Sequence, residues 1–486
     1  MEVQVDIGVV GLAVMGHNLV LNLNDHGFSV AVFDHDPDFV RSFEQDTSGK
    51  SGLYSCSSYA DLLSKLKRPR KVLLMVRAGA VVDEVIAKLV PHLEPGDVII
   101  DGGNSHFEDT GRRCNALAEQ QILFVGTGVS GGEEGARFGP SIMPGGNKEA
   151  WPLVAPFLQA IAARTESGEI CCEWVGQEGA GHYVKMVHNG IEYGDMQLIA
   201  EAYDLLKNYV ELDHESMGQV FSDWNQGDLS SYLVEISASI LRYRDSNGSP
   251  LVELIRDSAQ QKGTGKWMVN DAVNLGVPIT LIAEAVFARS LSLRKEEREV
   301  AAKFLPGPQP KAPAELDQVQ FTAAIRDALL ASKIISYTQG FMQISAAAKA
   351  NGWDVNLAEI AGMWRGGCII RSVFLDHIRS AFSCSAELES LILDEYFRGL
   401  IEGCQKGWRE VVAAAALSGI PTPAFSSALA FYDSYRAKQL PANFIQAQRD
   451  YFGAHTYERI DRPEGEFFHT NWTGTGGDVA SGSYSV

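Results

Sequence analysis

The feature that most constrains the fold is a strand–helix–strand pattern at the start of the chain. Residues 3–10 (VQVDIGVV) predict a buried strand that leads directly into the motif GLAVMG at 11–16, with Ala13 where the middle glycine usually stands. A helix follows the motif, and a second strand over 29–33 ends at Asp34. This order predicts a dinucleotide-binding unit, in which small residues let a pyrophosphate approach the N-terminus of the helix.

The same alternation continues along the first third of the chain. Apolar runs at 71–76, 97–101 and 121–125 predict further strands, and the stretches 80–93 and 109–120 between them have helical patterns. Strands separated by helices form mostly parallel sheets that are covered on both faces. We therefore predict an α/β, doubly wound domain of the Rossmann type and place this dinucleotide-binding domain at residues 1–178.

Polar residues and glycines follow the ends of these predicted strands. Ligands bind at the carboxyl ends of the strands in such sheets, which is where Arg77, Asn104 and Ser130-Gly131-Gly132 fall. Each glycine pair is also compatible with an ordinary loop, but the shared position favours one common cleft. The residues expected to bind the dinucleotide are Gly11, Leu12, Ala13, Val14, Met15, Gly16, Asp34, His35, Asp36, Val76, Arg77, Ala78 and Asn104.

The second region, residues 179–435, has an almost wholly helical pattern. Long amphipathic stretches at 181–209 and 316–351 dominate it, and the proline-rich segment 305–313 is the predicted joint between its halves. The segment from Tyr193 to Gly227 is faintly echoed by the segment from Tyr337 to Gly367. Two matches of this quality can arise by chance, so internal duplication of an all-α domain is a hypothesis.

One predicted helix, residues 182–197, carries reactive side chains along a single face. Lys185, His188, Asn189 and Glu192 stand at offsets of zero, three, four and seven, and Tyr193 follows. A solvated surface face would explain the polar stripe alone. The apolar positions that flank it favour burial, and a buried lysine two turns from a buried glutamate suggests a paired base and acid.

Two further features of the helical region suggest a binding site for an anion. The segment QQKGTGKW at 260–267 combines Lys262 and Thr264 in a glycine-punctuated basic loop that suits a phosphate. It lacks the spacing of a nucleoside triphosphate loop. Arg289 ends an apolar stretch, and a lone arginine in that position is more often a surface residue.

The last region, residues 436–486, has the Gly/Ser-rich end of a tail but too many aromatic residues for a free one. It contains Phe444, Tyr451, Phe452, Phe467, Phe468 and Trp472. Such a segment is expected to pack on the body of the protein or on a second subunit.

The composition excludes several classes of function. A net charge of −20 argues against non-specific binding to nucleic acid or anionic membranes, although one basic cleft can still bind an anionic substrate. The seven cysteines are scattered without a CxxC pair or zinc spacing, which predicts no disulfide framework and no metal site. The chain begins with a strand pattern rather than a signal peptide, and no apolar run reaches about 18 residues. We expect a soluble, cytoplasmic protein.

The motifs together resemble those of the 6-phosphogluconate dehydrogenase family, the decarboxylating enzymes of the pentose phosphate pathway. The resemblance covers essentially the whole chain in the right order. It rests on GLAVMG at 11–16, DGGNS at 101–105, GVSGGEEGAR at 128–137, HYVKMVHNGIEYGDMQ at 182–197, QQKGTGKW at 260–267 and QAQRDYFGAHTYER at 446–459.

The resemblance implies oxidation of 6-phosphogluconate at C3 and loss of CO₂ to give ribulose 5-phosphate, with hydride transfer to NAD or NADP and no metal. It implies that Lys185 is the base, that Glu192 is the acid, and that His188 and Asn189 hold the substrate. Its other implied substrate contacts are Asn104, Ser130, Gly131 and Gly132 at the carboxylate end, and Tyr193, Lys262, Thr264 and Arg289 at the phosphate. Arg449 and His455 would reach the phosphate from the tail of a neighbouring subunit in a homodimer.

The chain departs from the family after the second strand. Most relatives carry Asn-Arg-Thr or Asn-Arg-Ser there, and the arginine pairs with the 2′-phosphate of NADP. This chain has Asp34-His35-Asp36. Carboxylates accept hydrogen bonds from a free ribose diol and repel a phosphate, so we expect a preference for NAD. Contacts from Arg77 or Arg41 to the 2′-phosphate are the alternative.

Two other functions remain open at this stage. Other β-hydroxyacid dehydrogenases, such as those acting on 3-hydroxyisobutyrate, share the N-terminal fold and the lysine, but they are shorter and lack the tail motif. A non-catalytic dinucleotide-binding protein is the other alternative, and the intact Lys185, Asn189 and Glu192 argue against it.

Overall fold

The computed structural model describes residues 4–308, 310, 313–385 and 387–475. The chain divides into two compact units, Met1–Leu429 and Ala430–Val486. The predicted first strand begins at residue 3, which lies outside the described residues, as does the end of the predicted tail beyond residue 475. None of the described helices is long and apolar enough to cross a membrane.

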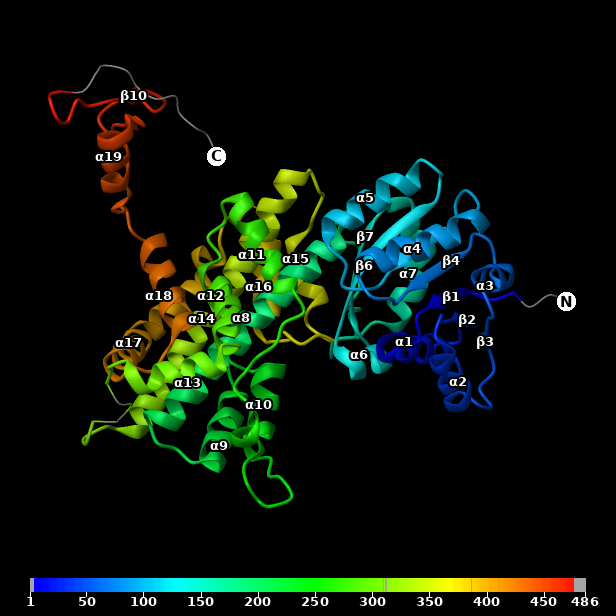
Figure 1. Ribbon diagram of the computed structural model, residues 1–486, viewed down its shortest axis with the longest axis horizontal. Coiled ribbons are helices and arrows are strands. Elements are labelled where there is room, and N and C mark those ends of the chain that lie inside the picture. The colour runs from blue at the N-terminus through cyan, green and yellow to red at the C-terminus, as the bar shows by residue number, and fades with distance from the viewer. Residues whose placement is uncertain (1–3, 309, 311–312, 386, 476–486) are drawn as a thin grey trace. The chain divides into compact units, whose positions relative to one another are not determined.

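Within the described residues, eight strands form one sheet in the order β3-β2-β1-β4-β5-β6-β7-β8 (Figure 1). The strands are β1 Ile7–Val10, β2 Val30–Phe33, β3 Leu53–Ser55, β4 Lys71–Leu74, β5 Val98–Asp101, β6 Leu123–Ser130, β7 Ser141–Gly146 and β8 Gly176–Gln177. Strands β1 to β6 are parallel, β7 is antiparallel to β6, and β8 is parallel to β7. The predicted Rossmann-type sheet is confirmed, and β3, β7 and β8 extend it beyond the strands predicted from the sequence.

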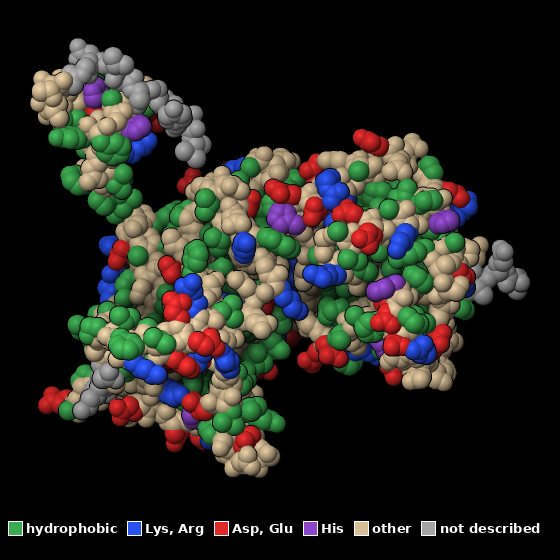
Figure 2. Space-filling model, viewed as in Figure 1, with side chains coloured by type: hydrophobic (Ala, Val, Ile, Leu, Met, Phe, Trp, Pro, Cys, Tyr) green, Lys and Arg blue, Asp and Glu red, His purple; other side chains and the backbone are tan. Residues whose placement is uncertain are grey.

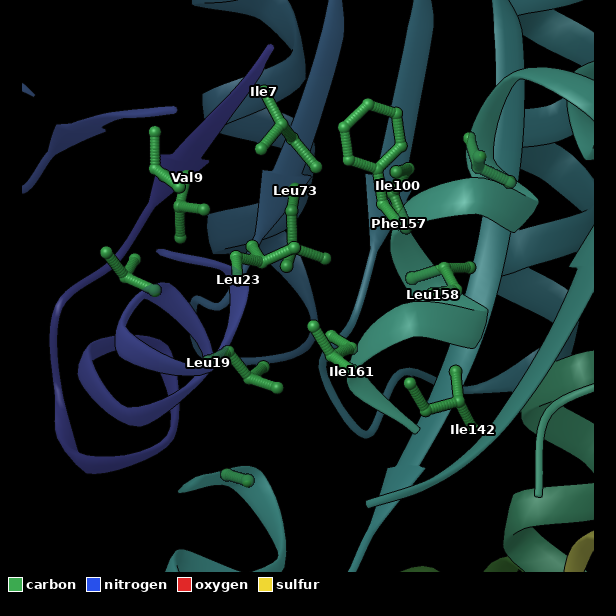
Figure 3. Packing of buried hydrophobic residues seen from close by; sticks show 14 of the residues in the cluster. Ile7, Val9, Leu19, Leu23, Leu73, Ile100, Ile142, Phe157, Leu158 and Ile161 are labelled. Atoms are coloured by element: carbon green, nitrogen blue, oxygen red, sulfur yellow. The ribbon is translucent and has the colours of Figure 1, made fainter. Parts of the chain in front are cut away.

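Helices cover both faces of this sheet, as the alternating pattern predicts. Before the helical region these are α1 Val14–Asp25, α2 Pro37–Asp46, α3 Tyr59–Lys65, α4 Ala80–Leu89, α5 Phe107–Ala118, α6 Gly132–Phe138, α7 Trp151–Ile161 and the 3₁₀ turns Val90–His92 and Lys148–Ala150. On one face Ile7 and Val9 of β1 pack with Leu19 of α1 and Phe157 of α7 (Figure 3). On the other face Val10 packs among buried residues of α3, α4 and α5. Strand β1 is apolar on both sides because both sides are buried.

Strand β6 is longer than the sequence predicts. Its glycines resemble a loop, yet Gly126 and Gly128 lie within the strand. A Cβ atom on Gly128 would stand 2.4 Å from Cβ of Lys185 in helix α8, and one on Gly126 would stand 2.8 Å from Nδ1 of His182. These glycines therefore serve close packing of a helix on the strand rather than a turn.

The helical region is built around two long helices, α8 Ala180–Asn208 and α14 Gln318–Asn351, which pack on each other. Both were predicted from their periodicity. The other helices are α9 His214–Trp224, α10 Tyr232–Arg242, α11 Thr264–Leu275, α12 Thr280–Ser292, α13 Lys295–Phe304, α15 Leu357–Met363, α16 Phe374–Cys384, α17 Glu395–Ser418 and α18 Pro423–Tyr435, with 3₁₀ turns at Leu251–Leu254 and Leu391–Leu393. The faint repeat falls on α8–α9 and on α14–α15, a long helix followed by a short one each time.

The second unit contains helix α19 Ala442–Gly453 and a short hairpin of β9 Tyr457–Glu458 and β10 Phe467–Phe468. The aromatic-rich tail is thus a small folded segment over its described residues. Apolar side chains gather over α19 (Figure 2), where Phe444 is 67% and Phe452 73% exposed.

Candidate active site

Helix α8 lies directly against the sheet because glycine faces glycine where they meet. A Cβ atom on Gly181 would stand 2.4 Å from the carbonyl oxygen of Gly126 and 2.5 Å from that of Met143, so any side chain here would push the helix away. The His182 ring fixes the same end of the helix through a 2.7 Å hydrogen bond between its Nδ1 and Oγ1 of Thr110 in α5. This packing brings Lys185 to the carboxyl end of β6.

Lys185 is a buried amine, with only 6% of the residue exposed. Its Nζ lies 3.4 Å from Nδ1 of His188. Burial lowers the pKa of Lys185, and the opposing charge of Glu192 only partly offsets this effect. The structure therefore favours the neutral amine that a general base requires.

His188 connects the lysine to the end of strand β6. Its ring is fully buried, with Nε2 3.2 Å from Oγ of Ser130 and Nδ1 3.2 Å from Oδ1 of Asn189. The edge of the ring packs on Trp364 at 5.6 Å between centroids. Burial and the neighbouring Lys185 hold its pKa well below the usual value, so the imidazole is neutral and can relay or orient one proton.

Glu192 lies one turn beyond His188, with Oε2 3.9 Å from the His188 Nδ1 and 22% of its side chain exposed. Burial raises the pKa of this carboxyl, while Lys185 and Arg289 act in the opposite direction. A carboxyl with a raised pKa beside an amine with a lowered pKa is the arrangement of a general acid and a general base.

A second cluster stands next to the first along α8. The guanidinium of Arg289 stacks on the Tyr193 ring, with its central carbon 3.6 Å from the ring centroid. Helix α11 approaches the same ring, since a Cβ atom on Gly265 would lie 2.7 Å from it. Arg289 is therefore a partly buried member of a site and not the isolated surface arginine that its sequence context favours.

Thr264 and Lys262 belong to the N-terminal end of α11. The predicted loop ends sooner than expected, because Gly263 takes a left-handed conformation (φ 97°) and Thr264 begins the helix. A helix N-terminus with free amides attracts anions. The structure thus brings Tyr193, Thr264 and Arg289 together, with Lys262 exposed one residue before the Gly263 turn.

Arg449 and His455, predicted to contact the phosphate, belong to the second unit. Arg449 is exposed near the end of α19, where its Nη1 donates to Oε1 of Gln446 at 2.7 Å. His455 follows the helix and packs edge-on against Phe452, with 5.9 Å between centroids.

The glycine motif after β1 has the shape of a pyrophosphate cradle. Gly11 has φ 101°, and a Cβ atom there would stand 2.5 Å from the carbonyl oxygen of Met75. Ala13 precedes α1 without a side-chain cap, which leaves the amides of Val14 and Met15 available at the helix N-terminus. These residues fit a dinucleotide.

In the acidic triplet after β2, the Asp34 carboxylate was expected to face a ribose, but it accepts hydrogen bonds from the backbone. The Asp34 carboxylate is buried beneath the glycine motif, where it accepts hydrogen bonds from the backbone N–H of Leu12 (2.7 Å) and of Asp36 (2.9 Å). Asp36 caps α2 by accepting from the N–H of Asp38. His35, with 88% of its side chain exposed and Nδ1 3.1 Å from Oδ1 of Asp34, is the most accessible member of the triplet.

The other predicted cofactor and substrate residues lie in loops at the same edge of the sheet. Val76, Arg77 and Ala78 connect β4 to α4, and Asn104 stands exposed after β5. Ser130 ends β6, and Gly131 (φ 113°) and Gly132 (φ 63°) begin the turn into α6.

Two features from distant parts of the chain were not predicted from the sequence, a backbone contact at the Ser130 turn and a buried ion pair on α8. The segment after α15 lies on the Ser130 turn, since a Cβ atom on Gly131 would stand 2.6 Å from the carbonyl oxygen of Gly367. Lys333 of α14 and Asp195 of α8 form a fully buried ion pair with 2.5 Å between Nζ and Oδ2. For the contact with Gly367, the sequence offers one signal, the faint repeat in which the segment ending at Gly367 matches the segment ending at Gly227. For the ion pair it offers none.

The described residues contain no group of three or more His, Cys, Asp or Glu side chains that could hold a metal ion. A dinucleotide-type sheet with an acid–base cluster at its carboxyl edge is the architecture of nicotinamide-dependent dehydrogenases.

Comparisons with known proteins define the class further. The family model described as the NAD binding domain of 6-phosphogluconate dehydrogenase matches residues 6–176, and the model of the C-terminal domain of 6-phosphogluconate dehydrogenase matches residues 181–472. The chain belongs to the 6-phosphogluconate dehydrogenase family.

Relatives match over the full length. The decarboxylating 6-phosphogluconate dehydrogenase of Mus musculus is 57% identical over 483 residues, which cover 99% of this chain and 100% of the relative. That of Haemophilus influenzae is 57% identical over 486 residues, 100% of both chains. A solved structure of Plasmodium falciparum 6-phosphogluconate dehydrogenase, described with NADP⁺ and with 6-phosphogluconate, has a TM-score of 0.92 and 41% identity and covers 96% of this chain and 100% of that one.

Proposed function

We propose that the protein catalyses the oxidative decarboxylation of 6-phosphogluconate to ribulose 5-phosphate and CO₂. The observation that carries the proposal is the buried sequence Lys185–His188–Glu192 on α8, with the cationic Tyr193–Arg289 cluster next to it. The two clusters suit the two ends of one substrate, a hydroxyacid at one and a phosphate at the other. The relatives named above are decarboxylating 6-phosphogluconate dehydrogenases.

In the first step, neutral Lys185 takes the proton of the C3 hydroxyl. A bound nicotinamide would supply the acceptor for the hydride that leaves C3. Ser130, held by His188 at 3.2 Å, and Asn104 orient the carboxylate end and the hydroxyls of the substrate. A lysine with a lowered pKa is suited to this step because it is deprotonated before the substrate binds.

In the second step, the protonated Lys185 donates to the new C3 carbonyl oxygen. This polarises the carbonyl of the β-keto acid, so the C1–C2 bond breaks, CO₂ leaves, and the bonding electrons form a C2–C3 double bond. The ammonium thus polarises the carbonyl, as a metal ion does in other decarboxylases. Glu192 then protonates C1 of the resulting enediol, which was C2 of the substrate. Lys185 takes back the proton of the hydroxyl on the neighbouring carbon, and this gives the ketose. The raised pKa of Glu192 keeps its proton available for this step.

The phosphate is proposed to bind between Tyr193, Lys262, Thr264 and Arg289. Several cationic groups and a helix N-terminus oppose the charge of a phosphate dianion on an otherwise acidic chain. We propose further that the protein is a homodimer and that the partner subunit's Arg449 and the partner subunit's His455 complete this site. The exposed aromatic side chains of α19 support a tail that docks on another surface.

The proposed domain organisation follows from these roles. Residues 1–178 bind the dinucleotide, residues 179–435 bind the substrate and form the dimer, and residues 436–486 reach the neighbouring subunit. An internal duplication with its joint near 305–313 is proposed for the second domain.

NAD is the proposed preferred cofactor. Asp34 and Asp36 put two carboxylates at the end of β2, and a 2′-phosphate would be repelled there. Arg41, the alternative cation for a 2′-phosphate, pairs with Asp38, and Arg77 stands exposed after β4 on a different strand. The Plasmodium relative is described with NADP⁺, so we propose a different cofactor preference for this chain.

The test is an assay that follows the absorbance of the reduced nicotinamide together with release of CO₂. We expect turnover with 6-phosphogluconate and NAD and none with 3-hydroxyisobutyrate. Binding of the dinucleotide without turnover of 6-phosphogluconate would contradict the proposal and favour a non-catalytic protein.

A further inference from the structure

The folded tail is organised around a buried charge. Among the described residues 436–475, Asp450 is the one residue that is fully buried, with 0% exposure. A segment of this size has too few apolar residues inside it to form a hydrophobic core of its own. A carboxylate takes the position that an apolar side chain occupies in larger domains.

The carboxylate of Asp450 accepts four hydrogen bonds. Oδ1 accepts from the backbone N–H of Thr456 at 3.0 Å and contacts Nδ1 of His469 at 2.9 Å. Oδ2 accepts from the backbone N–H of Thr470 at 3.0 Å and from Nε1–H of Trp472 at 2.8 Å. These donors come from the turn after α19 and from the segment that follows β10, so the Asp450 side chain of α19 joins three segments.

The bonds keep this group ionised. Burial alone raises the pKa of a carboxyl, but the hydrogen bonds from Thr470, His469, Trp472 and Thr456 more than offset burial and hold the pKa of Asp450 below its usual range. The charge is therefore part of the folded tail at neutral pH.

Arg449 and His455 stand on either side of this bonded centre. Arg449 precedes Asp450 on α19, and His455 lies between Ala454 (φ 50°) and Thr456 (φ 58°), two residues in the left-handed conformation that side chains disfavour. The Thr456 N–H bond to Asp450 holds this turn. The His455 ring packs on Gly453, and a Cβ atom there would stand 2.5 Å from Nε2 of His455 and displace the ring.

We infer that Asp450 is a positioning residue for phosphate binding, which presents Arg449 and His455 in a fixed arrangement before the tail meets its target. The inference rests on the proposed function, in which these two residues reach the phosphate of 6-phosphogluconate. Pre-arranged binding groups lose less conformational freedom on binding, so the effect should appear in substrate affinity.

The experiment compares Asp450→Asn with the wild-type full-length enzyme. An amide nitrogen cannot accept the bonds that one carboxylate oxygen accepts, so two of the four bonds are lost. We expect the KM for 6-phosphogluconate to rise about tenfold or more, since hydrogen bonds to charged groups have effects of this order, while the KM for the dinucleotide and kcat change little. The matched control is Asp461→Asn, which breaks the exposed pair with Arg459 in the same unit and should leave both KM values unchanged.

A milder variant keeps the test decisive if Asp450→Asn disorders the whole tail. Trp472→Phe removes one donor and keeps an aromatic ring, and it should raise the same KM by a smaller factor. An unchanged KM for 6-phosphogluconate in both variants would overturn the inference, as would equal increases in both KM values. A wild-type enzyme that does not turn over 6-phosphogluconate would contradict the proposed function instead, so the two failures are distinguishable.

Discussion

Lys185 in α8 and Asp450 in the tail are both buried ionisable groups, yet the surroundings of Lys185 favour its neutral form and those of Asp450 favour its charged form. Lys185 has one polar contact near hydrogen-bond distance, His188, and burial lowers its pKa toward the neutral form. Asp450 has four donors, and its pKa falls so that the charge is kept. Burial disfavours a charge only when hydrogen bonds do not replace the lost water.

The comparison separates a reactive group from a structural one. A buried group whose charge is left unsupported can exchange a proton during a reaction, whereas a fully bonded one holds the structure around it. The Asp195–Lys333 pair lies between these cases. Each charge supports the other, but Oδ1 of Asp195 has no hydrogen-bond partner among the described residues.

The largest expected effect comes from removing the reactive amine. Lys185→Met should lower kcat by a factor of about 10²–10⁴ or more, as expected for loss of a general base, and should leave dinucleotide binding intact. Steady-state kinetics measure kcat, and titration with the dinucleotide measures its binding. Lys349→Met, at an exposed lysine near the end of α14, is the control. A variant with more than about a tenth of wild-type kcat would show that another group is the base.

The next largest effect tests the tail as a whole. Truncation before Asn443 removes both Arg449 and His455. Two charge-assisted contacts contribute about 1.5–3 kcal/mol each, so the KM for 6-phosphogluconate should rise at least about 100-fold. Dinucleotide binding should be retained. The double variant Arg449→Ala with His455→Ala keeps the tail and should show most of the same rise. An unchanged KM in the truncated enzyme would remove the tail from the site.

A smaller effect is expected at the end of β2. His35→Arg should raise kcat/KM for NADP about tenfold, because an arginine–phosphate pair adds roughly 1.5–3 kcal/mol. Adding Asp34→Asn, which keeps one acceptor oxygen for the Leu12 N–H, should complete the change of preference from NAD to NADP. The measurement is kcat/KM for both cofactors at saturating 6-phosphogluconate. A wild-type preference for NADP would refute the assignment of NAD.

The smallest effect is a shift in the pH profile. Activity needs neutral Lys185, which exists above the lysine's lowered pKa, and protonated Glu192, which exists below the glutamate's raised pKa, so kcat should follow a bell. Arg289 lowers the pKa of Glu192, so Arg289→Gln should raise that pKa and move the alkaline limb to higher pH. The pH profile of kcat at saturating substrate tests this, with Lys349→Gln in α14 as control. A limb that moves to lower pH would contradict the assignment of Glu192 as the acid.

Local sequence patterns predicted the elements that repeat along the chain. Apolar runs indicated β1 and β5, a 3.6-residue period indicated α8, and the polar stripe placed Lys185, His188 and Glu192 on one face. These features depend on neighbours within a few residues, and for that reason they can be predicted from a single sequence.

Contacts between distant residues could not be predicted in the same way. Gly126 and Gly128 suggested a loop because the helix that packs on them begins more than fifty residues later. The Asp34 carboxylate looked available to a ribose because nothing local shows that the N–H of Leu12 turns toward it. Asp450 looked like one acidic residue among many, since its donors at 469–472 lie beyond a hairpin.

The contact between Gly128 and Lys185 has a consequence for tolerance to sequence change. No side chain from the strand stands between β6 and α8 at this point, so Cβ of Lys185 lies directly on the main chain of Gly128, and this contact sets the height of the reactive amine above the strand. Repacking of the surrounding core can alter rotamers and volumes without altering that height. Substitutions in the surrounding core therefore leave the reacting atoms in place as long as residue 128 is glycine, and a side chain at this position would move them.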